Sequence, residues 1–418
     1  MKVLAVHNYY QQAGGEDVVF HAEAEMLRDH GQEIVTYTRK NDEIDRLDPF
    51  GKAALPLKTI WARDSYQQIK QIIANDPPDI AHFHNTFPLI SPAAYYACRR
   101  ANIPVVQTLH NSRLLCPAAT LFRDGHACEE CVGKAVPWPA LLHGCYRGSR
   151  IQTGVVAAML ATHRARGTWK NDISAFICST ELYRKKFIAG GLPAEKVFCK
   201  PHFVPSDPGS RQGDGNYALF IGRLAAEKGV ETLITAWKRP LRRRIKIRGD
   251  GPLLPEVQRL RNYSCGAVDL VPRLDRSDLF ALIKGARFLV WPSLGYYESF
   301  GLVAIEALAC GVPVLASRIG VMQEIIQDRH TGLHFTAGDS GDLAAKVEWA
   351  WIHPSEMQEM GRNARAEYEA KYTAERNYHQ LMEIYERVIS AARAQPRRIQ
   401  LKAGGQDAIQ SGSEARFS

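Results

Sequence analysis

The chain has 418 residues, of which 45% are hydrophobic and 23% charged, and this ordinary globular composition excludes a chain that is disordered throughout. Its length exceeds what one hydrophobic core usually serves, so we expect two domains. The 53 lysine and arginine residues against 44 acidic residues give a net charge of +9. That balance favours an anionic partner such as a phosphorylated small molecule, a nucleic acid or an acidic membrane surface.

The chain offers no sign of a membrane span or an export signal. No apolar run reaches the roughly 18 to 20 residues that a membrane-spanning helix needs. The first residues carry only a four-residue apolar stretch before His7, shorter than the roughly 7 to 15 residues of a secretory signal. We therefore interpret this segment as a first strand and expect the chain to stay in the cytoplasm.

The first half of the chain alternates short apolar, β-rich runs with helical patterns. Strands are predicted at 2–7, 33–38, 79–84, 104–110 and 174–179. Helices are predicted at 16–30, 60–74 and 92–101. This alternation implies parallel strands joined by right-handed helical crossovers, and therefore a doubly wound α/β domain over residues 1–205.

A cluster of proline, glycine and polar residues at 206–215 is typical of an interdomain linker. Strands are then predicted at 217–221, 244–248, 267–271, 287–291 and 313–316, with helices at 228–237, 276–285 and 299–309. A second α/β domain thus covers 216–394 and is closed by helices at 343–351, 356–371 and 375–393. We expect the remaining segment, 395–418, to be disordered because it has few bulky apolar residues. Two such sheets leave a cleft between the carboxyl ends of their strands, where ligands bind.

The strongest candidate site lies where a predicted strand of the second half gives way to a helix. Glu298 stands at this helix entrance, and the backbone N–H groups of Ser299, Phe300 and Gly301 would form an anion site there. Glu306 has only apolar helix neighbours, so a buried carboxylate there needs a donor such as a ligand hydroxyl. The alternative is a solvated glutamate at the edge of the helix.

A second candidate element follows the strand predicted at 217–221. Arg223 and Lys228 lie five residues apart at a strand-to-helix turn, where two cations can pair with both phosphates of a nucleoside diphosphate. Such neutralisation would make a metal ion dispensable. The alternative is an ordinary first helical turn with solvated charges.

These two stretches resemble family 4 glycosyltransferases, the retaining, nucleotide-sugar-dependent enzymes of the GT-B fold. Glu298 and Glu306 match the Glu-x7-Glu element of that family, within a context, ESFGLVAIEALACGVPVLAS, that looks like its signature. The sequence GRLAAEKG is similar to its phosphate clamp. The resemblance implies that Glu298 contacts the donor sugar, that Glu306 holds the ribose hydroxyls, and that Arg223 and Lys228 stabilise the departing diphosphate.

The resemblance also carries expectations for the whole chain. It implies two Rossmann-like domains that face a central cleft, with closing C-terminal helices. It implies transfer of a sugar, a hexose in the first instance, from a nucleotide-sugar to a hydroxyl acceptor with retention of configuration and without a catalytic metal. The acceptor would be a saccharide or a lipid-linked molecule, and the context bacterial cell-surface polysaccharide biosynthesis.

Glycines and a histidine supply weaker signals that gain from the resemblance. Gly14 and Gly15 precede the first helix and let backbone approach a ligand closely, as in the glycine loop of the family, although a flexible turn is an equal alternative. His110 ends a strand, where the family carries a comparable histidine near the donor sugar. Gly249 lies in a turn similar to one near the nucleotide, although a plain turn is a strong alternative.

His82 and His84, at the end of the preceding strand, are rival candidates for contact with the acceptor. A single histidine at a strand end is more often a local hydrogen-bonding residue.

Four of the nine cysteines fall in an insert at 114–150 where the alternating pattern lapses, namely Cys116, Cys128, Cys131 and Cys145. A small loop without its own core is typical of what a tetrahedral zinc ion holds together. Structural metal and free thiols are equal alternatives on this spacing, and disulfides are less favoured in a reducing compartment.

The segment 147–170 mixes apolar and basic residues and can be interpreted as a peripheral contact with an anionic membrane, although a core-facing helix is the favoured alternative. Two other functions compete with sugar transfer. A nucleotide-sugar epimerase would use the same cleft, and a basic, zinc-containing protein could bind nucleic acid. The basic cluster at 238–244 lacks interleaved aromatic residues, so nucleic acid is a minor candidate.

Overall fold

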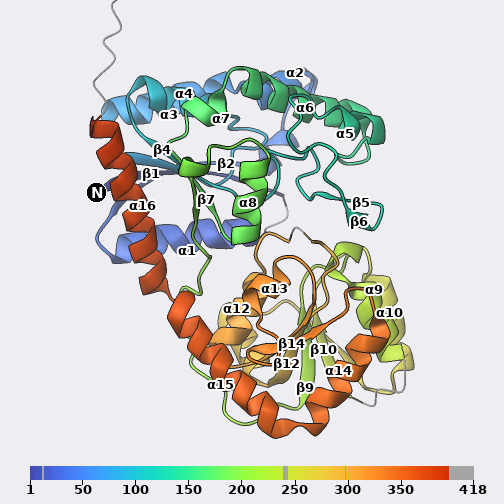
Figure 1. Ribbon diagram of the computed structural model, residues 1–418. Helices are drawn as coiled ribbons and strands as arrows, with labels where there is room; N and C mark the ends of the chain where they lie inside the picture. The colour runs from blue at the N-terminus through green and yellow to red at the C-terminus, as the bar shows by residue number, and fades with distance from the viewer. Residues whose placement is uncertain (12–13, 239–242, 297, 395–418) are drawn as a thin grey trace, which may run out of the picture.

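The computed structural model describes residues 1–11, 14–238, 243–296 and 298–394. Each half of the chain forms one six-stranded sheet, and helices cover both faces of each sheet (Figure 1). The predicted α/β class and the two doubly wound domains are therefore confirmed. The segment expected to be disordered, 395–418, lies outside the described residues.

The first sheet has the strand order β2-β1-β3-β4-β7-β8, and all its pairings are parallel. Its strands are β1 (Lys2–Tyr9), β2 (Glu33–Lys40), β3 (Ile80–Phe83), β4 (Val105–Thr108), β7 (Ala175–Cys178) and β8 (Val197–Cys199). The helices of this half are α1 (Gly15–Asp29), η1 (Asn41–Ile44), α2 (Pro49–Ile60), α3 (Arg63–Asn75), α4 (Ala93–Arg100), α5 (Trp138–His143), α6 (Arg150–Ala165), α7 (Thr168–Asn171), α8 (Glu181–Ala189) and η2 (Ala194–Lys196). A small antiparallel hairpin, β5 (Phe122–Arg123) and β6 (His126–Ala127), lies in the predicted insert.

The second sheet has the order β11-β10-β9-β12-β13-β14 and is also parallel. Its strands are β9 (Tyr217–Ile221), β10 (Ile245–Arg248), β11 (Val268–Val271), β12 (Ala286–Trp291), β13 (Val314–Ser317) and β14 (Gly332–Phe335). The helices are η3 (Ala226–Lys228), α9 (Val230–Lys238), α10 (Leu254–Tyr263), α11 (Arg276–Lys284), α12 (Leu302–Ala309), α13 (Met322–Ile325), α14 (Ser340–Ile352), α15 (Pro354–Lys371) and α16 (Ala374–Ala394).

In the first sheet the inner strands β1, β3, β4 and β7 are buried on both faces because helices cover both faces, whereas the edge strand β2 is largely exposed. In β1, Val3 packs into the cluster formed with α1 and α16, whereas Leu4 and Val6 pack into the cluster on the opposite face. The continuous apolar runs that predicted these strands therefore supply side chains to the two cores of the domain, one on each face of the sheet.

The chain passes between the domains twice, and the two crossings lie side by side. The backbone N–H of Val204 donates to the carbonyl of Tyr372 at 3.0 Å, and Val204 forms a parallel bridge with Thr373. Beyond the second crossing α16 returns to the first domain, where it crosses and packs against α1 (Figure 1). The sequence places 374–394 with the second half, whereas by packing α16 belongs to the first, since a helical pattern shows a buried face but not its partner.

A buried lysine fastens α16 to the first domain. The ammonium of Lys200, whose side chain is 1% exposed, donates to Glu23 at 2.9 Å and to the side-chain carbonyl of Asn377 at 2.7 Å. Burial alone would raise the pKa of Glu23, but the charge of Lys200 and the contact with His82 outweigh it and hold that pKa well below its usual value. Lys200 therefore joins α1, the segment after β8 and α16 through one charged group.

We expect Lys200→Met to lower the free energy of unfolding by about 3–5 kcal/mol, because it leaves the buried Glu23 carboxylate without its cation. Urea denaturation followed by tryptophan fluorescence measures the change. The control is Arg259→Ala, which removes the exposed pair with Glu256 and should change stability by less than about 1 kcal/mol. Equal stability of Lys200→Met and wild type would show that this ion pair does not hold the helix.

Candidate active site

Glu298 is a buried, charged carboxylate in the loop between β12 and α12. Its Oε1 pairs with the ammonium of Lys228, and its Oε2 accepts a hydrogen bond from the indole N–H of Trp291 at 3.1 Å. Burial alone would raise the pKa of Glu298, but Lys228 and Trp291 outweigh it, so the pKa lies below its ordinary value. The carboxylate is thus ionised at neutral pH and fixed in position.

The pairing depends on two turns that meet backbone to backbone. The carbonyl of Glu227, in the turn after β9, accepts hydrogen bonds from Leu294 at 2.9 Å and Gly295 at 3.3 Å, in the loop after β12. Gly229 has φ +69°, and a Cβ there would lie 1.8 Å from the carbonyl oxygen of Pro292. The approach therefore requires glycine and brings Lys228 within reach of Glu298.

The two predicted phosphate-binding cations do not share a partner. Lys228 pairs with Glu298, while the guanidinium of Arg223 pairs with Glu227 at 2.8 Å and remains 59% exposed. The structure thus brings Lys228 and Glu298 together and leaves Arg223 at the surface. The two-cation clamp stays a prediction.

The segment before α12 differs from the predicted helix start. The helix begins at Leu302, three residues later than predicted, because Gly301 has φ +89°. A Cβ at Gly301 would lie 2.1 Å from the ring of Trp291, so this position also requires glycine. The helix start leaves the N–H groups of Gly301, Leu302 and Val303 without an intrahelical acceptor, whereas that of Ala304 donates to the carbonyl of Gly301 at 2.9 Å. The anion site at Ser299, Phe300 and Gly301 stays a prediction.

Two neighbours of Gly301 serve the contact between the domains. Phe300 is 2% exposed and packs edge-on against His202 and Tyr372, so its side chain cannot reach a donor. The carbonyl of Ser299 accepts a hydrogen bond from the hydroxyl of Ser179, which follows β7, at 2.7 Å. A donor contact by Ser299, Phe300 or Gly301 stays a prediction, and for Phe300 such a contact would have to come from its backbone.

Gly249 follows β10 and packs directly against the turn after β9. A Cβ there would lie 2.0 Å from the carbonyl oxygen of Gly222. This close approach explains the glycine without a ligand, and its place near a nucleotide stays a prediction.

Glu306 is a half-buried carboxylate on α12 with no hydrogen-bond partner among the described residues. Burial raises its pKa to about 7, opposed by the charges of Arg276 and Arg248. The Nε of Arg248 is itself buried without a partner among those residues. Two unsatisfied polar groups near each other are what a ligand with hydroxyl groups would complete.

The glycine loop of the first domain reaches the second domain. A Cβ at Gly15 would lie 3.2 Å from Leu302, whereas the space around Gly14 is open. The loop after β1 therefore faces the start of α12, and together with the bond from Ser179 to Ser299 it shows that the carboxyl ends of the two sheets face each other.

His110 is a neutral histidine at the end of a buried row of rings. Its Nε2 shares a hydrogen bond with Nδ1 of His84 at 3.0 Å, and its ring stacks on His202 at 5.5 Å between centroids. Burial, together with the neighbouring His84 and His202, lowers the pKa of His110 well below its usual value. Among the described residues its Nδ1 has no hydrogen-bond partner and can serve a ligand.

The ring nitrogens of His82 and His84, the other candidates for contact with the acceptor substrate, all have partners within the protein. His82 bonds to the hydroxyls of Tyr385 at 2.6 Å and Thr108 at 2.8 Å. His84 bonds to His110, and its other nitrogen lies 3.3 Å from Glu23. Both therefore support the row that ends in His110. His84 also lines the cavity next to His110, so contact of these rings with the acceptor stays a prediction.

Two groups of side chains have the chemistry of metal ligands. Glu23, His82 and His84 place ligand atoms within 4.8 Å of one another. The ammonium of Lys200 lies 2.9 Å from Glu23 and would repel a cation there, so this group is a polar network. The second group is the set of four cysteines, which line one pocket of the insert.

Glu16 is a residue that the sequence does not single out. Its carboxylate accepts hydrogen bonds from the side-chain amides of Asn85 at 3.1 Å and Asn111 at 3.3 Å. Burial raises its pKa to about 8, opposed by the charge of Arg113. Asn85, Asn111 and Arg113 also line a cavity that reaches His110. Acidic residues are common in the first turn of a helix, so the type of residue alone gave no signal. The only sequence feature that could have indicated a functional role for Glu16 is its position directly after two glycines.

Comparison with known proteins decides the family. The model described as Glycosyltransferase Family 4 matches residues 13–207, and the model described as Glycosyl transferases group 1 matches residues 206–367. The chain belongs to the family 4 glycosyltransferases. The resemblance inferred from the two glutamate and clamp motifs is thereby confirmed.

Curated relatives in this family match parts of the chain. An uncharacterized glycosyltransferase, MJ1178, of Methanocaldococcus jannaschii is 31% identical over 42% of this chain and 49% of its own length. The alpha-D-kanosaminyltransferase of Streptomyces kanamyceticus is 27% identical over 70% of this chain and 73% of its own length. The chain thus spans about half of the first relative and 36% of the glycogen synthase of Mycobacterium tuberculosis.

Solved structures confirm the predicted GT-B fold. Anabaena Alr3699/HepE in complex with UDP matches with a TM-score of 0.64 at 17% identity, over 93% of this chain and 100% of that chain. The sucrose-phosphate synthase of Thermosynechococcus elongatus matches with a TM-score of 0.68 at 18% identity, over 93% and 99%.

We expect the stability of the protein to fall as the pH rises from 6.5 to 8. Glu16 keeps its proton up to about pH 8 when folded but loses it near 4.5 when unfolded, so the folded state binds more protons in this window. His84 and His110, whose pKa values are lowered, are neutral there in the folded state. Glu16→Gln should flatten the decline, as measured by thermal unfolding across this range.

The matched control for this experiment is Glu25→Gln, on an exposed carboxylate of the same helix α1, for which the wild-type slope should persist. A slope that is unchanged in Glu16→Gln would contradict the raised pKa.

Proposed function

We propose that the chain transfers a sugar from a nucleotide-sugar donor to a hydroxyl acceptor with retention of configuration. The observation that carries the proposal is the ionised Glu298, held by Lys228 at the carboxyl end of the second sheet and followed on α12 by the unsatisfied Glu306. Membership of the family supports the same reaction.

The second domain supplies groups for a nucleoside diphosphate. Glu306 can accept hydrogen bonds from two ribose hydroxyls, which would satisfy a half-buried carboxylate. When the bond between the sugar and the diphosphate breaks, negative charge grows on the leaving group, and Lys228 and Arg223 can stabilise it. Solved relatives of similar fold contain UDP and UDP-glucose, which supports this class of donor.

The first domain supplies groups for the sugar and the acceptor. The neutral His110 can hydrogen-bond a sugar hydroxyl through Nδ1, and Glu298 can orient the sugar from the other side. Arg113, Asn85 and Asn111 line the cavity next to His110, and Glu16 binds the two amides. These groups can bind the acceptor hydroxyl, whose oxygen forms the new bond to the sugar while its proton passes to the departing diphosphate. Gly14 and Gly15 close the site between the two domains.

Two bacterial-type sugar transferases, one of them named for the lipopolysaccharide outer core, support a cell-surface context. The D-rhamnosyltransferase WbpZ of Pseudomonas aeruginosa is 32% identical over 38% of this chain and 42% of its own length. The lipopolysaccharide outer core galactosyltransferase WaaB has a similar fold, with a TM-score of 0.57 at 16% identity over 94% of this chain and 99% of its own. We infer a polysaccharide or lipid-linked saccharide as acceptor.

An apolar surface on the first domain suits peripheral contact with an anionic membrane. Phe50 and Leu57 on α2 are 84% and 73% exposed. Trp138 and Leu142 on α5 and Ile151 on α6 are exposed as well, and α2 and α5 both pack on α6 at one end of this domain (Figure 1). Exposed Lys52 and Arg150 on the same helices add the positive charge that anionic lipid attracts.

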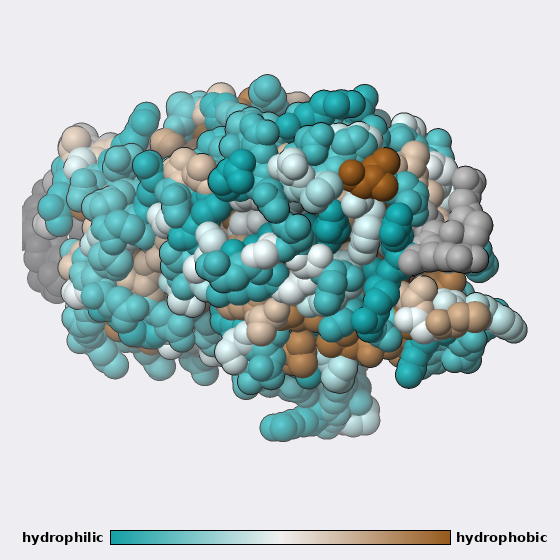
Figure 2. Space-filling model, turned by 90° about the horizontal axis from the view of Figure 1, so that it is seen from below, coloured by the Kyte–Doolittle hydropathy of each residue, from teal (hydrophilic) through white to brown (hydrophobic). Residues whose placement is uncertain are grey.

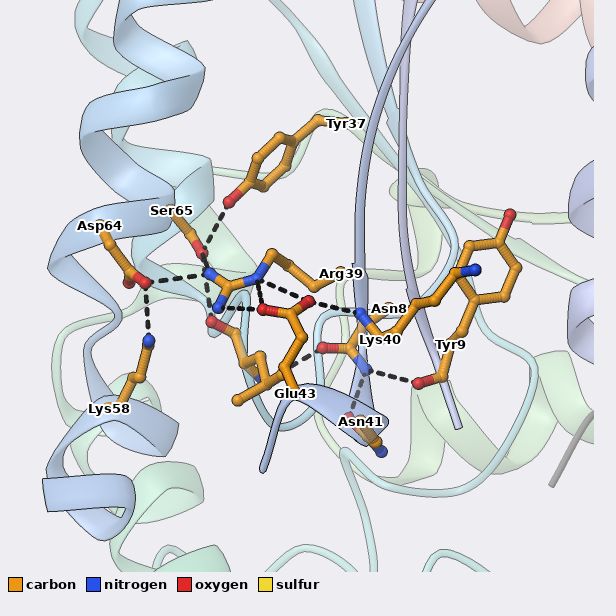
Figure 3. Close-up of polar contacts among 11 residues, drawn as sticks. Asn8, Tyr9, Tyr37, Arg39, Lys40, Asn41, Glu43, Lys58, Asp64 and Ser65 are labelled. Atoms are coloured by element: carbon orange, nitrogen blue, oxygen red, sulfur yellow. Dashed lines mark hydrogen bonds and ion pairs between the residues drawn. The ribbon is translucent and has the colours of Figure 1, made fainter. Parts of the chain in front are cut away.

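The contacts of α2 with the rest of the domain leave its apolar side outward. Thr59 is its one buried side chain, and Lys58 pairs with Asp64 at 2.6 Å, where Arg39 also binds (Figure 3).

Seen from below, by contrast, the molecule is mainly hydrophilic, with hydrophobic side chains in separate patches (Figure 2). None of the described helices is long and apolar enough to cross a membrane.

In the segment 147–170 the core-facing alternative describes most of the helix, since Val156, Met159 and Leu160 are buried. The basic cluster gives little support to nucleic acid, because Arg243 pairs with Glu348 at 3.0 Å and Arg244 with Asp269 at 3.1 Å.

We expect Lys228→Met to reduce kcat by about 100-fold or more, because removing one charge-stabilising donor typically costs that much. Thermal shift with a panel of nucleoside-diphosphate sugars selects the donor, and release of the diphosphate in the presence of a hydroxyl acceptor gives the rate. The control is Arg244→Ala, on an exposed ion pair of the same domain. Full activity of Lys228→Met would sink the proposed charge stabilisation, and conversion of the donor sugar without any acceptor would indicate an epimerase.

We expect the protein to cosediment with vesicles of anionic phosphatidylglycerol and less with neutral phosphatidylcholine. Leu57→Glu should weaken this binding several-fold, because the charge opposes burial of α2 in the interface. Tyr263→Glu, at an 83% exposed position on α10 of the second domain, is the matched control and should bind like wild type. Binding that does not depend on lipid charge, or equal loss in both variants, would overturn the assignment of this surface.

A further inference from the structure

The insert at 114–150 lacks the means to hold its own fold. Its regular structure amounts to the two-residue strands β5 and β6 and the six-residue helix α5. Leu115, Leu121 and Ala140 are its buried apolar side chains outside the cysteines and prolines. A segment of this kind needs a cross-link or a metal ion to be ordered independently.

The four cysteines of the insert come together around one pocket. Cys116, Cys128, Cys131 and Cys145, which span 30 positions of the sequence, all line it. Cys131 is buried, and the other three are partly buried. All four are free thiols.

Cationic side chains lie where a thiolate cluster would place its charge. A tetrahedral site of four thiolates around a divalent ion carries a net charge of −2, which needs compensation. Arg123 lines the pocket, next to its ion-pair partners Asp124 and Glu130. Arg164 donates hydrogen bonds to the carbonyls of Leu114 at 2.7 Å and Ala135 at 3.3 Å, on either side of the stretch that carries Cys116, Cys128 and Cys131.

We propose that Cys116, Cys128, Cys131 and Cys145 bind one structural zinc ion. Four soft sulfur ligands in a closed site suit zinc, which has no redox chemistry and prefers tetrahedral geometry. On binding, four thiols release four protons to solvent and four zinc–sulfur bonds form. Among the described residues the one group of three or more ligand atoms that all lie within 4.8 Å of one another is that of Glu23, His82 and His84, so the four sulfurs must move closer together to bind the ion.

The proposed ion would order a part of the site that borders the acceptor. The β5–β6 hairpin lies on the side of the first domain that faces the second (Figure 1). The insert is tied to α8 by the pair of Glu129 with Lys186 at 2.7 Å. At its start, Arg113 donates to the carbonyl of Pro117 and lines the cavity next to His110. Loss of zinc should therefore loosen the acceptor side of the site without touching the donor side.

Elemental analysis of the full chain, purified with a tag that binds no metal, tests the proposal without any assay of sugar transfer. We expect about one equivalent of zinc per chain. Cys131→Ser and Cys116→Ser should each lower the content at least tenfold, while Cys265→Ser, on an exposed cysteine of the second domain, should keep it. Replacement by cadmium should add the ultraviolet absorption of sulfur–cadmium bonds.

The wild-type measurement decides the matter even where a cysteine variant fails to fold. Less than a tenth of an equivalent of zinc in folded protein that also takes up none from added zinc chloride would overturn the proposal. So would a disulfide among the four cysteines, detected as a deficit of free thiols after denaturation with chelator and without reductant. Zinc that persists in Cys131→Ser would remove that residue from the ligand set and overturn the four-thiolate site.

Discussion

The buried ammonium of Lys200 is the interaction on which the arrangement of the two domains depends. It lies just before the first crossing of the chain and binds Asn377, just after the second, so both crossings are fixed to α1 through Glu23. The same Glu23 lies between His82 and His84, the row of rings that ends in His110. The ion pair of Lys200 with Glu23 therefore both fixes the two crossings and supports the histidines that border the site.

The two glutamates of the Glu-x7-Glu element, Glu298 and Glu306, have side-chain carboxyl groups whose pKa values are shifted in opposite directions. Glu298 and Glu306 are eight positions apart, and burial acts on both in the same direction. A cation within bonding distance makes Glu298 ionised, whereas Glu306, with only distant arginines, has a pKa raised to about 7. Environments that push the pKa values of two carboxyl groups apart assign them to different tasks. On the proposed function, these tasks are orientation of the sugar and recognition of the ribose.

Much of the fold could be predicted because parallel strands carry continuous apolar runs, and the two motifs identified the family. Most of the features that the sequence did not predict depend on contacts between residues that are distant in the chain. The start of α12 at Leu302 depends on the contact between Gly301 and the ring of Trp291, and α2 was not predicted because its apolar residues face outward instead of a core. The pairing of Lys228 with Glu298 spans 70 positions. Glu16 gave no signal because its chemistry comes from amides on two distant loops.

The departures from a regular α/β pattern gather in the first domain. The exposed helix α2, the cysteine insert and the histidine row all belong to it, whereas the second domain follows the alternating pattern closely. A nucleoside diphosphate presents the same chemistry to every enzyme that uses it, so its domain can be built from regular turns and a few glycines. An acceptor differs from one enzyme to the next, and loops change at less cost to the core than strands do. On the proposed function, this asymmetry means that the first domain determines which acceptor is glycosylated, and the close approach of Gly15 to Leu302 couples that choice to the donor.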